Sequence, residues 1–129
     1  MRAVGVVVAS IAGMLCGASA AWAQAYPAKP VRVIIPFPPG GANDLVARIV
    51  LPRLSERVGQ SFVIEDRSGA GGTIGTAVVA QSRRDGYTVM IQTSASHVSN
   101  EHLYKKLPYD PLNDFVGVTP LACSSRSWA

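Results

Sequence analysis

The sequence predicts an α/β fold, a parallel sheet with flanking helices, and three observations support this fold class. Short runs rich in β-branched and apolar residues occur at 31–35, 62–65 and 87–91, and each is typical of a strand. A turn of glycine, proline or hydroxyl residues follows each run, and a helical pattern follows each turn. Strands that alternate with helices through short connections form parallel sheets with right-handed crossovers.

The first 23 residues are predicted to be a cleaved export signal rather than part of this fold. Arg2 precedes an apolar segment at 3–17, and Ala21-Trp22-Ala23 matches the small-residue cleavage site. A membrane anchor is the alternative, but the apolar segment is shorter than the ~20 residues that span a bilayer. We therefore expect cleavage after Ala23 and a periplasmic protein.

The remaining chain has the size and charge of one small, mildly basic domain. Cleavage takes 23 of the 129 residues and leaves 106, which is enough for a core. Eleven basic and eight acidic side chains remain, and the only basic pairs are Arg83-Arg84 and Lys105-Lys106. No dense basic stripe is present, so we expect no nucleic-acid partner. Cys123 is the only remaining cysteine, which excludes an internal disulfide in the mature chain.

The segment that follows the first strand predicts an anion-binding loop. The strand at Val31–Ile35 must end at the prolines that follow, because proline cannot continue a ladder. Gly40-Gly41 allows a sharp turn, and Asn43 and Asp44 are favourable N-cap residues for the next helix. Free backbone N–H groups at a helix N-terminus bind anions.

The first predicted helix spans 44–58, bends at Pro52 and ends at Gly59. The second strand, 62–65, leads through a glycine-rich turn into a helix at 73–82, and the third strand is 87–91. A hydroxyl-rich loop at 93–96 precedes a short helix at 98–105, an irregular segment at 107–115 and an extended stretch at 116–121. The apolar positions predicted to face the core are Leu45, Val46, Ile49, Val50, Leu54 and Val58 in the first helix, and Ile74, Ala77, Val78 and Ala80 in the second.

We expect the strand order 2-1-3, with the chain direction reversing around the first strand. Ligands of such sheets bind outside the carboxyl ends of the strands at this switch point. The Pro39–Asn43 and Thr93–His97 loops both lie there, where amides and hydroxyls could hold a small carboxylate. The alternatives are a tight turn without a ligand for Gly40-Gly41, and helix capping for Thr93 and Ser94.

Other chemistries are less well supported by the sequence. No Gly-Lys pair exists, which excludes a P-loop, and Gly69–Gly75 misses the dinucleotide fingerprint because Ile74 occupies its last glycine position. Ser94 and Ser96 lack a nucleophile elbow, and no His pairs with Cys, Asp or Glu at metal-ligand spacing. Asp110 and Asp114 are expected to serve turns. A Rossmann-type nucleotide-binding enzyme domain and an interaction module through the exposed sheet remain alternatives.

Several distinctive motifs occur in a fixed order along the chain. They are Tyr26-Pro27-Ala28-Lys29-Pro30-Val31-Arg32, Pro36-Phe37-Pro38-Pro39-Gly40-Gly41, Gly69-Ala70-Gly71-Gly72-Thr73-Ile74-Gly75, Asp85-Gly86-Tyr87-Thr88 and Leu103-Tyr104-Lys105-Lys106-Leu107-Pro108-Tyr109-Asp110-Pro111. Over about Tyr26 to Ala122 the chain resembles the substrate-binding receptors of tripartite tricarboxylate transporters, also called Bug receptors. The resemblance covers the N-terminal part of such receptors.

The resemblance implies a partial first lobe of a type II periplasmic binding protein, residues 24–122. It implies a receptor, not an enzyme, that binds a small carboxylate between two lobes without metal or cofactor and delivers it to a membrane permease. The family does not continue into residues 123–129, which predicts a truncation or frameshift. The implied ligand-binding residues are Pro39, Gly40, Gly41, Ala42, Asn43, Thr93, Ser94, Ala95 and His97.

Overall fold

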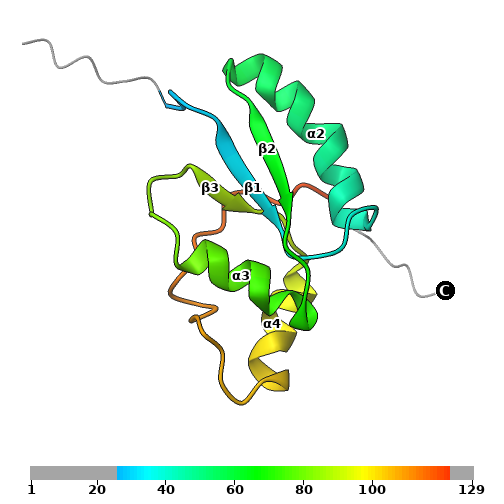
Figure 1. Ribbon diagram of the computed structural model, residues 1–129, viewed down its shortest axis with the longest axis vertical. Helices are drawn as coiled ribbons and strands as arrows, with labels where there is room; N and C mark the ends of the chain where they lie inside the picture. The colour runs from blue at the N-terminus through cyan, green and yellow to red at the C-terminus, as the bar shows by residue number, and fades with distance from the viewer. Residues whose placement is uncertain (1–25, 123–129) are drawn as a thin grey trace, which may run out of the picture.

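Three strands form one parallel sheet in the computed structural model, which describes residues 26–122 (Figure 1). Strand β1 spans Val31–Ile35, β2 spans Phe62–Asp66 and β3 spans Thr88–Met90, in the order β2-β1-β3. Both neighbours of β1 run parallel to it. The predicted strand order and direction are therefore confirmed. The predicted export signal and the 123–129 tail lie outside the described residues.

The core lies between β1 and helix α2 (Ala42–Val58). Val33 and Ile35 of β1 are fully buried and pack with Ala47 and Leu51 of α2. Ile34 is also fully buried, although successive side chains of a strand point to opposite faces, so both faces of β1 are covered. Each such side chain contributes roughly 1.5–3 kcal/mol relative to an exposed one. A strand buried on both faces explains the uninterrupted apolar run at 33–35.

Helix α2 continues through Pro52 and ends where predicted. Gly59 adopts a left-handed conformation (φ 74°), and its N–H donates to the Ser55 carbonyl at 2.9 Å. The start of α2 differs from the prediction. Gly41 is the N-cap, no side chain caps the helix, and Asp44 lies within its first turn. Asp44 instead accepts a hydrogen bond from the Gly40 amide, so its carboxylate reaches back beyond the cap.

The predicted buried face of α2 is wrong in part. Leu45 and Ile49 are 61% and 55% exposed, whereas Asp44, Ala47 and Leu51 are buried. Ala47 allows the helix backbone to approach the sheet closely, and a buried aspartate is tolerated because it is paired. The apolar pattern could not show this rotation, because a buried charge interrupts the face that packs on the sheet.

Glycines bring the next helix close to the end of β1. A 3₁₀ turn, η2 (Ala70–Gly72), leads into α3 (Thr73–Ala80), and Gly72 has a φ of 91°. A Cβ on Gly75 would lie 2.7 Å from the Arg67 carbonyl oxygen and 2.8 Å from Pro36 Cβ. The face of α3 that packs on the sheet is thus made of small residues. The predicted core residue Ile74 is 53% exposed instead.

Helix α4 (Ser94–Leu103) begins four residues earlier than predicted. Thr93 is its N-cap, so the residues predicted to form a hydroxyl-rich loop form its first turn. The segment from Phe115 to Pro120 contains no helix or strand, and Val116 and Val118 are 91% and 85% exposed. The extended stretch predicted at 116–121 therefore adds no strand to the sheet within the described residues.

Replacement of Gly75 by alanine tests the close approach of α3 to the sheet. Gly75→Ala is expected to lower the free energy of unfolding by about 1–3 kcal/mol, because the new methyl group meets backbone that cannot move easily. Urea denaturation measures the loss. Gly117→Ala is the matched control, since a Cβ there meets no atom within 4 Å. Equal stability of the two variants would contradict the close packing.

Candidate ligand site

The two loops predicted to bind a ligand both lie at the carboxyl edge of the sheet. The first follows β1 and leads into α2, and the second follows β3 and leads into α4. Because β1 and β3 are parallel neighbours, the two loops leave the same edge, and the N-termini of α2 and α4 lie at that edge (Figure 1). The fold therefore brings together the loops that the sequence singled out.

The loop after β1 is held in shape by Asp44. The Gly40 N–H donates to Asp44 Oδ2 at 2.7 Å, and Arg48 Nε lies 2.7 Å from Asp44 Oδ1. The hydrogen bond and charge of Arg48, with the Gly40 amide, lower the pKa of Asp44 below its ordinary value. The Gly40 amide, expected to be free, is thus engaged within the chain.

Ala42 and Asn43 carry the amides of this loop that suit a ligand. Both lie in the first turn of α2, where no side chain caps the helix. The first intrahelical bond runs from the Leu45 N–H to the Gly41 carbonyl at 2.9 Å. Pro39 and Ala42 are exposed, and Gly41 and Asn43 are half-buried. These two amides at the positive end of the helix dipole could donate hydrogen bonds to an anion.

The side chain of Thr93 caps α4, as the capping alternative predicts. Thr93 Oγ1 accepts a 3.4 Å hydrogen bond from the Ser96 N–H and lies 2.8 Å from Ser96 Oγ. Ser96 Oγ lies 2.9 Å from the Thr93 carbonyl oxygen, to which it can donate. Ser94 and Ala95 occupy the first turn of α4. Their amides have the same position relative to α4 that Ala42 and Asn43 have in α2.

His97 uses both ring nitrogens within the chain. Nε2 lies 2.8 Å from the Pro111 carbonyl oxygen, and Nδ1 is hydrogen-bonded to the side-chain amide of Gln92. The imidazole also makes an edge-to-face contact with Phe115, with 5.2 Å between ring centroids. His97 therefore anchors α4 to the segment that follows it.

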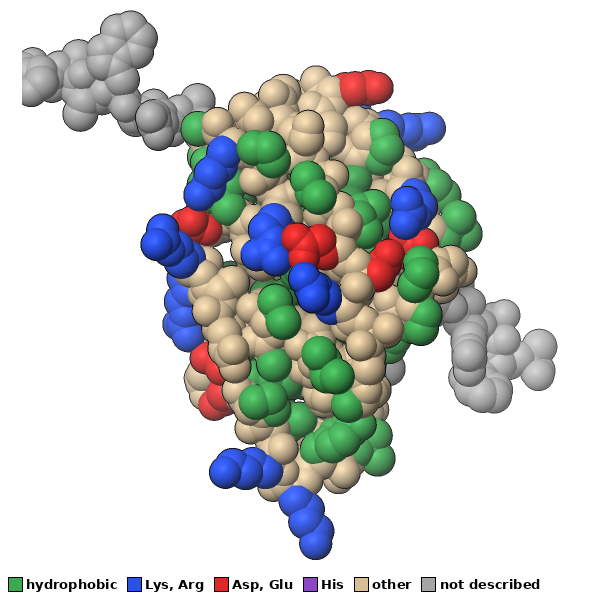
Figure 2. Space-filling model, viewed as in Figure 1, with side chains coloured by type: hydrophobic (Ala, Val, Ile, Leu, Met, Phe, Trp, Pro, Cys, Tyr) green, Lys and Arg blue, Asp and Glu red, His purple; other side chains and the backbone are tan. Residues whose placement is uncertain are grey.

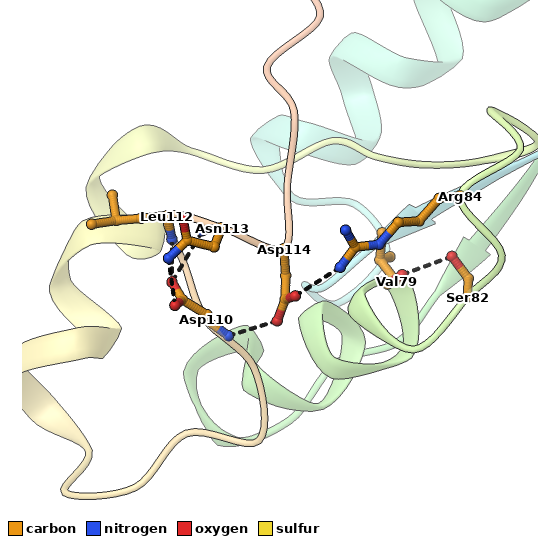
Figure 3. Close-up of polar contacts among 7 residues, drawn as sticks. All are labelled: Val79, Ser82, Arg84, Asp110, Leu112, Asn113 and Asp114. Carbon is orange, nitrogen blue, oxygen red and sulfur yellow. Dashed lines mark hydrogen bonds and ion pairs between the residues drawn. The ribbon is translucent and has the colours of Figure 1, made fainter.

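The turn at 110–114 is organised by its two aspartates, as predicted (Figure 3). Asp110 Oδ1 accepts from the Leu112 and Asn113 amides at 2.9 and 3.0 Å, and Oδ2 accepts from Asn113 Nδ2 at 2.7 Å. Asp114 accepts from the Asp110 amide at 2.8 Å and from Arg84 at 3.0 Å. The Asn113 side chain, followed by the Leu112 and Asn113 amides, lowers the pKa of Asp110.

Charged side chains near the sheet are paired. Arg32 donates to both carboxylate oxygens of Glu65 at 2.8 and 3.0 Å, and Arg67 lies 3.3 Å from the same carboxylate. Hydrogen bonding by Arg32 is the main reason that the pKa of Glu65 is lowered. Basic and acidic side chains are interspersed on the face shown in Figure 2. This face carries no dense basic stripe of the kind that binds nucleic acid.

A groove of about 460 Å³ lies elsewhere, between α2 and β2, and includes Arg48, Leu51 and Phe62 in its lining. None of the predicted ligand-binding residues lines it. Over residues 26–122, no group of His, Cys, Asp and Glu is arranged to hold a metal ion. No helix in that range combines the length and hydropathy needed to cross a bilayer.

The ligand-binding roles of the nine named residues stay predictions, but the structure shows what each loop contributes. Two functional contacts were not predicted from the sequence: Asp44 shapes the first loop, and Gln92 is the partner of His97. The spacing of Asp44 from Gly40 offered a signal, because an aspartate in the first turn of a helix can accept from an upstream amide.

The parallel sheet with its flanking helices matches part of the fold of periplasmic binding proteins. Residues 46–128 match the model of the tripartite tricarboxylate transporter family receptor, and the chain belongs to this family. The match extends past residue 122, where the sequence analysis placed the end of the resemblance. Protein BugT of Bordetella pertussis is 42% identical over 98 residues, which are 75% of this chain and 30% of BugT.

Solved structures support the same assignment. The periplasmic binding protein BugD is 39% identical, with a TM-score of 0.66 over 70% of this chain and 30% of BugD. MatC of Rhodopseudomonas palustris with bound malate is 37% identical, with a TM-score of 0.65 over 70% of this chain and 31% of MatC. R. palustris Rpa4515 with adipate is 44% identical, with a TM-score of 0.63 over 67% of this chain and 29% of Rpa4515. The chain thus spans about a third of the length of these relatives.

Replacement of Asp44 by asparagine tests the ion pair that shapes the first loop. A lowered folded pKa means that Asp44 stabilises the fold fully above its unfolded pKa of about 3.9 and loses this effect as pH falls through the folded value. Asp44→Asn is expected to unfold at lower temperature than wild type at pH 7, and the difference should shrink on acidification toward pH 3. Calorimetry at several pH values measures it. A constant difference would contradict the role of the charge.

Proposed function

We propose that this chain supplies one wall of the ligand site of a periplasmic receptor for a small carboxylate, which the receptor delivers to a membrane transporter. The amides in the first turns of α2 and α4 hold one carboxylate group of the ligand. Neither lobe closure nor catalysis is needed for this contact. The site residues are backbone donors, so no ionisable side chain has to change its state on binding.

The position of two helix N-termini at one edge of the sheet is the observation that supports this proposal. Backbone donors there are oriented by the helices, so little ordering is required when an anion binds. The bound malate of MatC and the adipate of Rpa4515 are small dicarboxylates, which favours the same ligand class for this family member. The predicted export signal and the family favour a periplasmic location and a permease as partner.

The Rossmann alternative has less support. Gly69–Gly75 was the motif that suggested it, but packing explains Gly75, whose missing Cβ allows close contact with Arg67 and Pro36. Gly72 and Gly71 adopt positive φ values of 91° and 65°, which a tight turn requires. The family consists of solute-binding receptors, and we propose no catalytic role for this chain.

Proline substitution at Ala42 removes one proposed donor with little change to the fold. Ala42 is the first residue of α2, a position that accepts proline, and the preceding Gly41 has a compatible extended conformation (φ −74°, ψ 170°). In NMR titrations of the purified chain with malate and adipate, we expect weak, millimolar binding with shifts confined to the amides of 41–43 and 93–95. Ala42→Pro should weaken the binding further.

Ala42→Ser is the matched control, because it changes the side chain and retains the amide. It should bind as wild type does. Ser94→Pro applies the same change to α4, whose N-cap Thr93 is also extended (φ −84°, ψ 140°). Shifts elsewhere, an absence of shifts, or equal binding by the proline variants would reject the assignment of these amides. Micromolar affinity would contradict the view that this chain supplies only one wall.

A further inference from the structure

We infer that His97 is a positioning residue, which fixes the second ligand loop through a polar relay and does not itself hold the ligand. The inference rests on the proposed function, because the loop it positions is the proposed wall at α4. The relay joins the turn at 110–114, the first turn of α4 and the segment that follows β3.

The chemistry of the partners fixes the proton of His97. The Pro111 carbonyl can only accept, so Nε2 must carry the hydrogen. In the neutral ring Nδ1 is then an acceptor, and Gln92 donates to it through its amide nitrogen. The Gln92 carbonyl oxygen lies 3.4 Å from Thr76 Oγ1, but the single hydroxyl hydrogen of Thr76 goes to the nearer Gly72 carbonyl oxygen at 2.8 Å. Pro111, His97 and Gln92 therefore form a relay of matched donors and acceptors.

The turn that contains Pro111, the acceptor of the His97 hydrogen bond, is itself held by several side-chain contacts. Pro111 lies in the turn organised by Asp110 and Asp114, and Arg84 fastens Asp114 to the segment before β3 (Figure 3). Phe115 packs against the His97 ring and against Tyr109, which is 7% exposed. These contacts therefore stabilise the turn on both sides of the Pro111 carbonyl, which His97 contacts.

A second contact fixes the middle of α4. Asn100 is 4% exposed and donates from Nδ2 to the Gly71 carbonyl at 3.1 Å. His97 and Asn100 lie three residues apart on one face of α4, so both point inward together. One side chain ties α4 to the following turn and the other ties it to η2. The orientation of the Ser94 and Ala95 amides thus depends on two side chains that follow them in α4, His97 in the first turn and Asn100 in the next.

The tautomer of His97 tests this inference without any ligand. Long-range proton–nitrogen NMR of the full chain should show His97 with its hydrogen on Nε2 alone. His102, an exposed histidine in the same helix, is the internal control and should show both tautomers in exchange. Glutamate at 92 can only accept, so Gln92→Glu should add a hydrogen at Nδ1 while Nε2 keeps its own, giving a doubly protonated His97 ring, and should leave His102 unchanged. His97 that behaves like His102, or does not respond to Gln92→Glu, would overturn the relay.

Loss of the ring tests whether the relay positions the loop. His97→Ala should accelerate amide hydrogen exchange in the first turn of α4 and at 111–115 by about tenfold, as expected for the loss of a stabilising hydrogen bond. His102→Ala should not. If His97 positions the loop, titration of His97→Ala with malate should still shift residues 41–43, with weaker shifts at 93–95. Unchanged exchange or unchanged 93–95 shifts would refute positioning, whereas absence of all malate shifts in wild type would reject the proposed function alone.

Discussion

Parallel pairing of β1 with both of its neighbours is the constraint on which the arrangement of the site depends. Val31 donates to the Ser61 carbonyl in the segment before β2, whereas Arg32 donates to the Tyr87 carbonyl in the segment before β3, each at 2.9 Å. The backbone of β1 thus alternates between its two neighbours. Because all the strands point the same way, each one releases its following loop at the same edge. Loops separated by some fifty residues of chain consequently face the same solvent region.

How far the sequence could predict the fold depended on the range of the interactions involved. The apolar run at 31–35 and the stop at Gly59 reflect local backbone preferences, and both were confirmed. The rotation of α2 was missed because a buried Asp44 occupies the face that packs on the sheet. Its burial is possible only because Arg48 and the Gly40 amide compensate the charge, and a hydrophobicity pattern cannot express such compensation.

The same reasoning applies to the candidate site. Its location followed from strand order, which topology rules determine well. The role of His97 did not follow, because its partner Pro111 lies fourteen residues away in a segment with no regular pattern. Thr93 shows the opposite case, since a hydroxyl residue before a helix predicts a cap, and the cap is present. Local hydrogen bonds could thus be anticipated, whereas long-range polar contacts required coordinates.

The pairing of Asp44 with Arg48 has a consequence for how the first loop attracts solutes. Arg48 also lies 3.9 Å from Asp66 Oδ2, so these three groups together carry no excess positive charge, and the attraction of an anion to the start of α2 comes from the amide dipoles. A dipolar field decays with distance more steeply than that of a point charge. The loop therefore attracts an anion only weakly from bulk solution. It distinguishes one anion from another at contact, through shape and the direction of its hydrogen-bond donors.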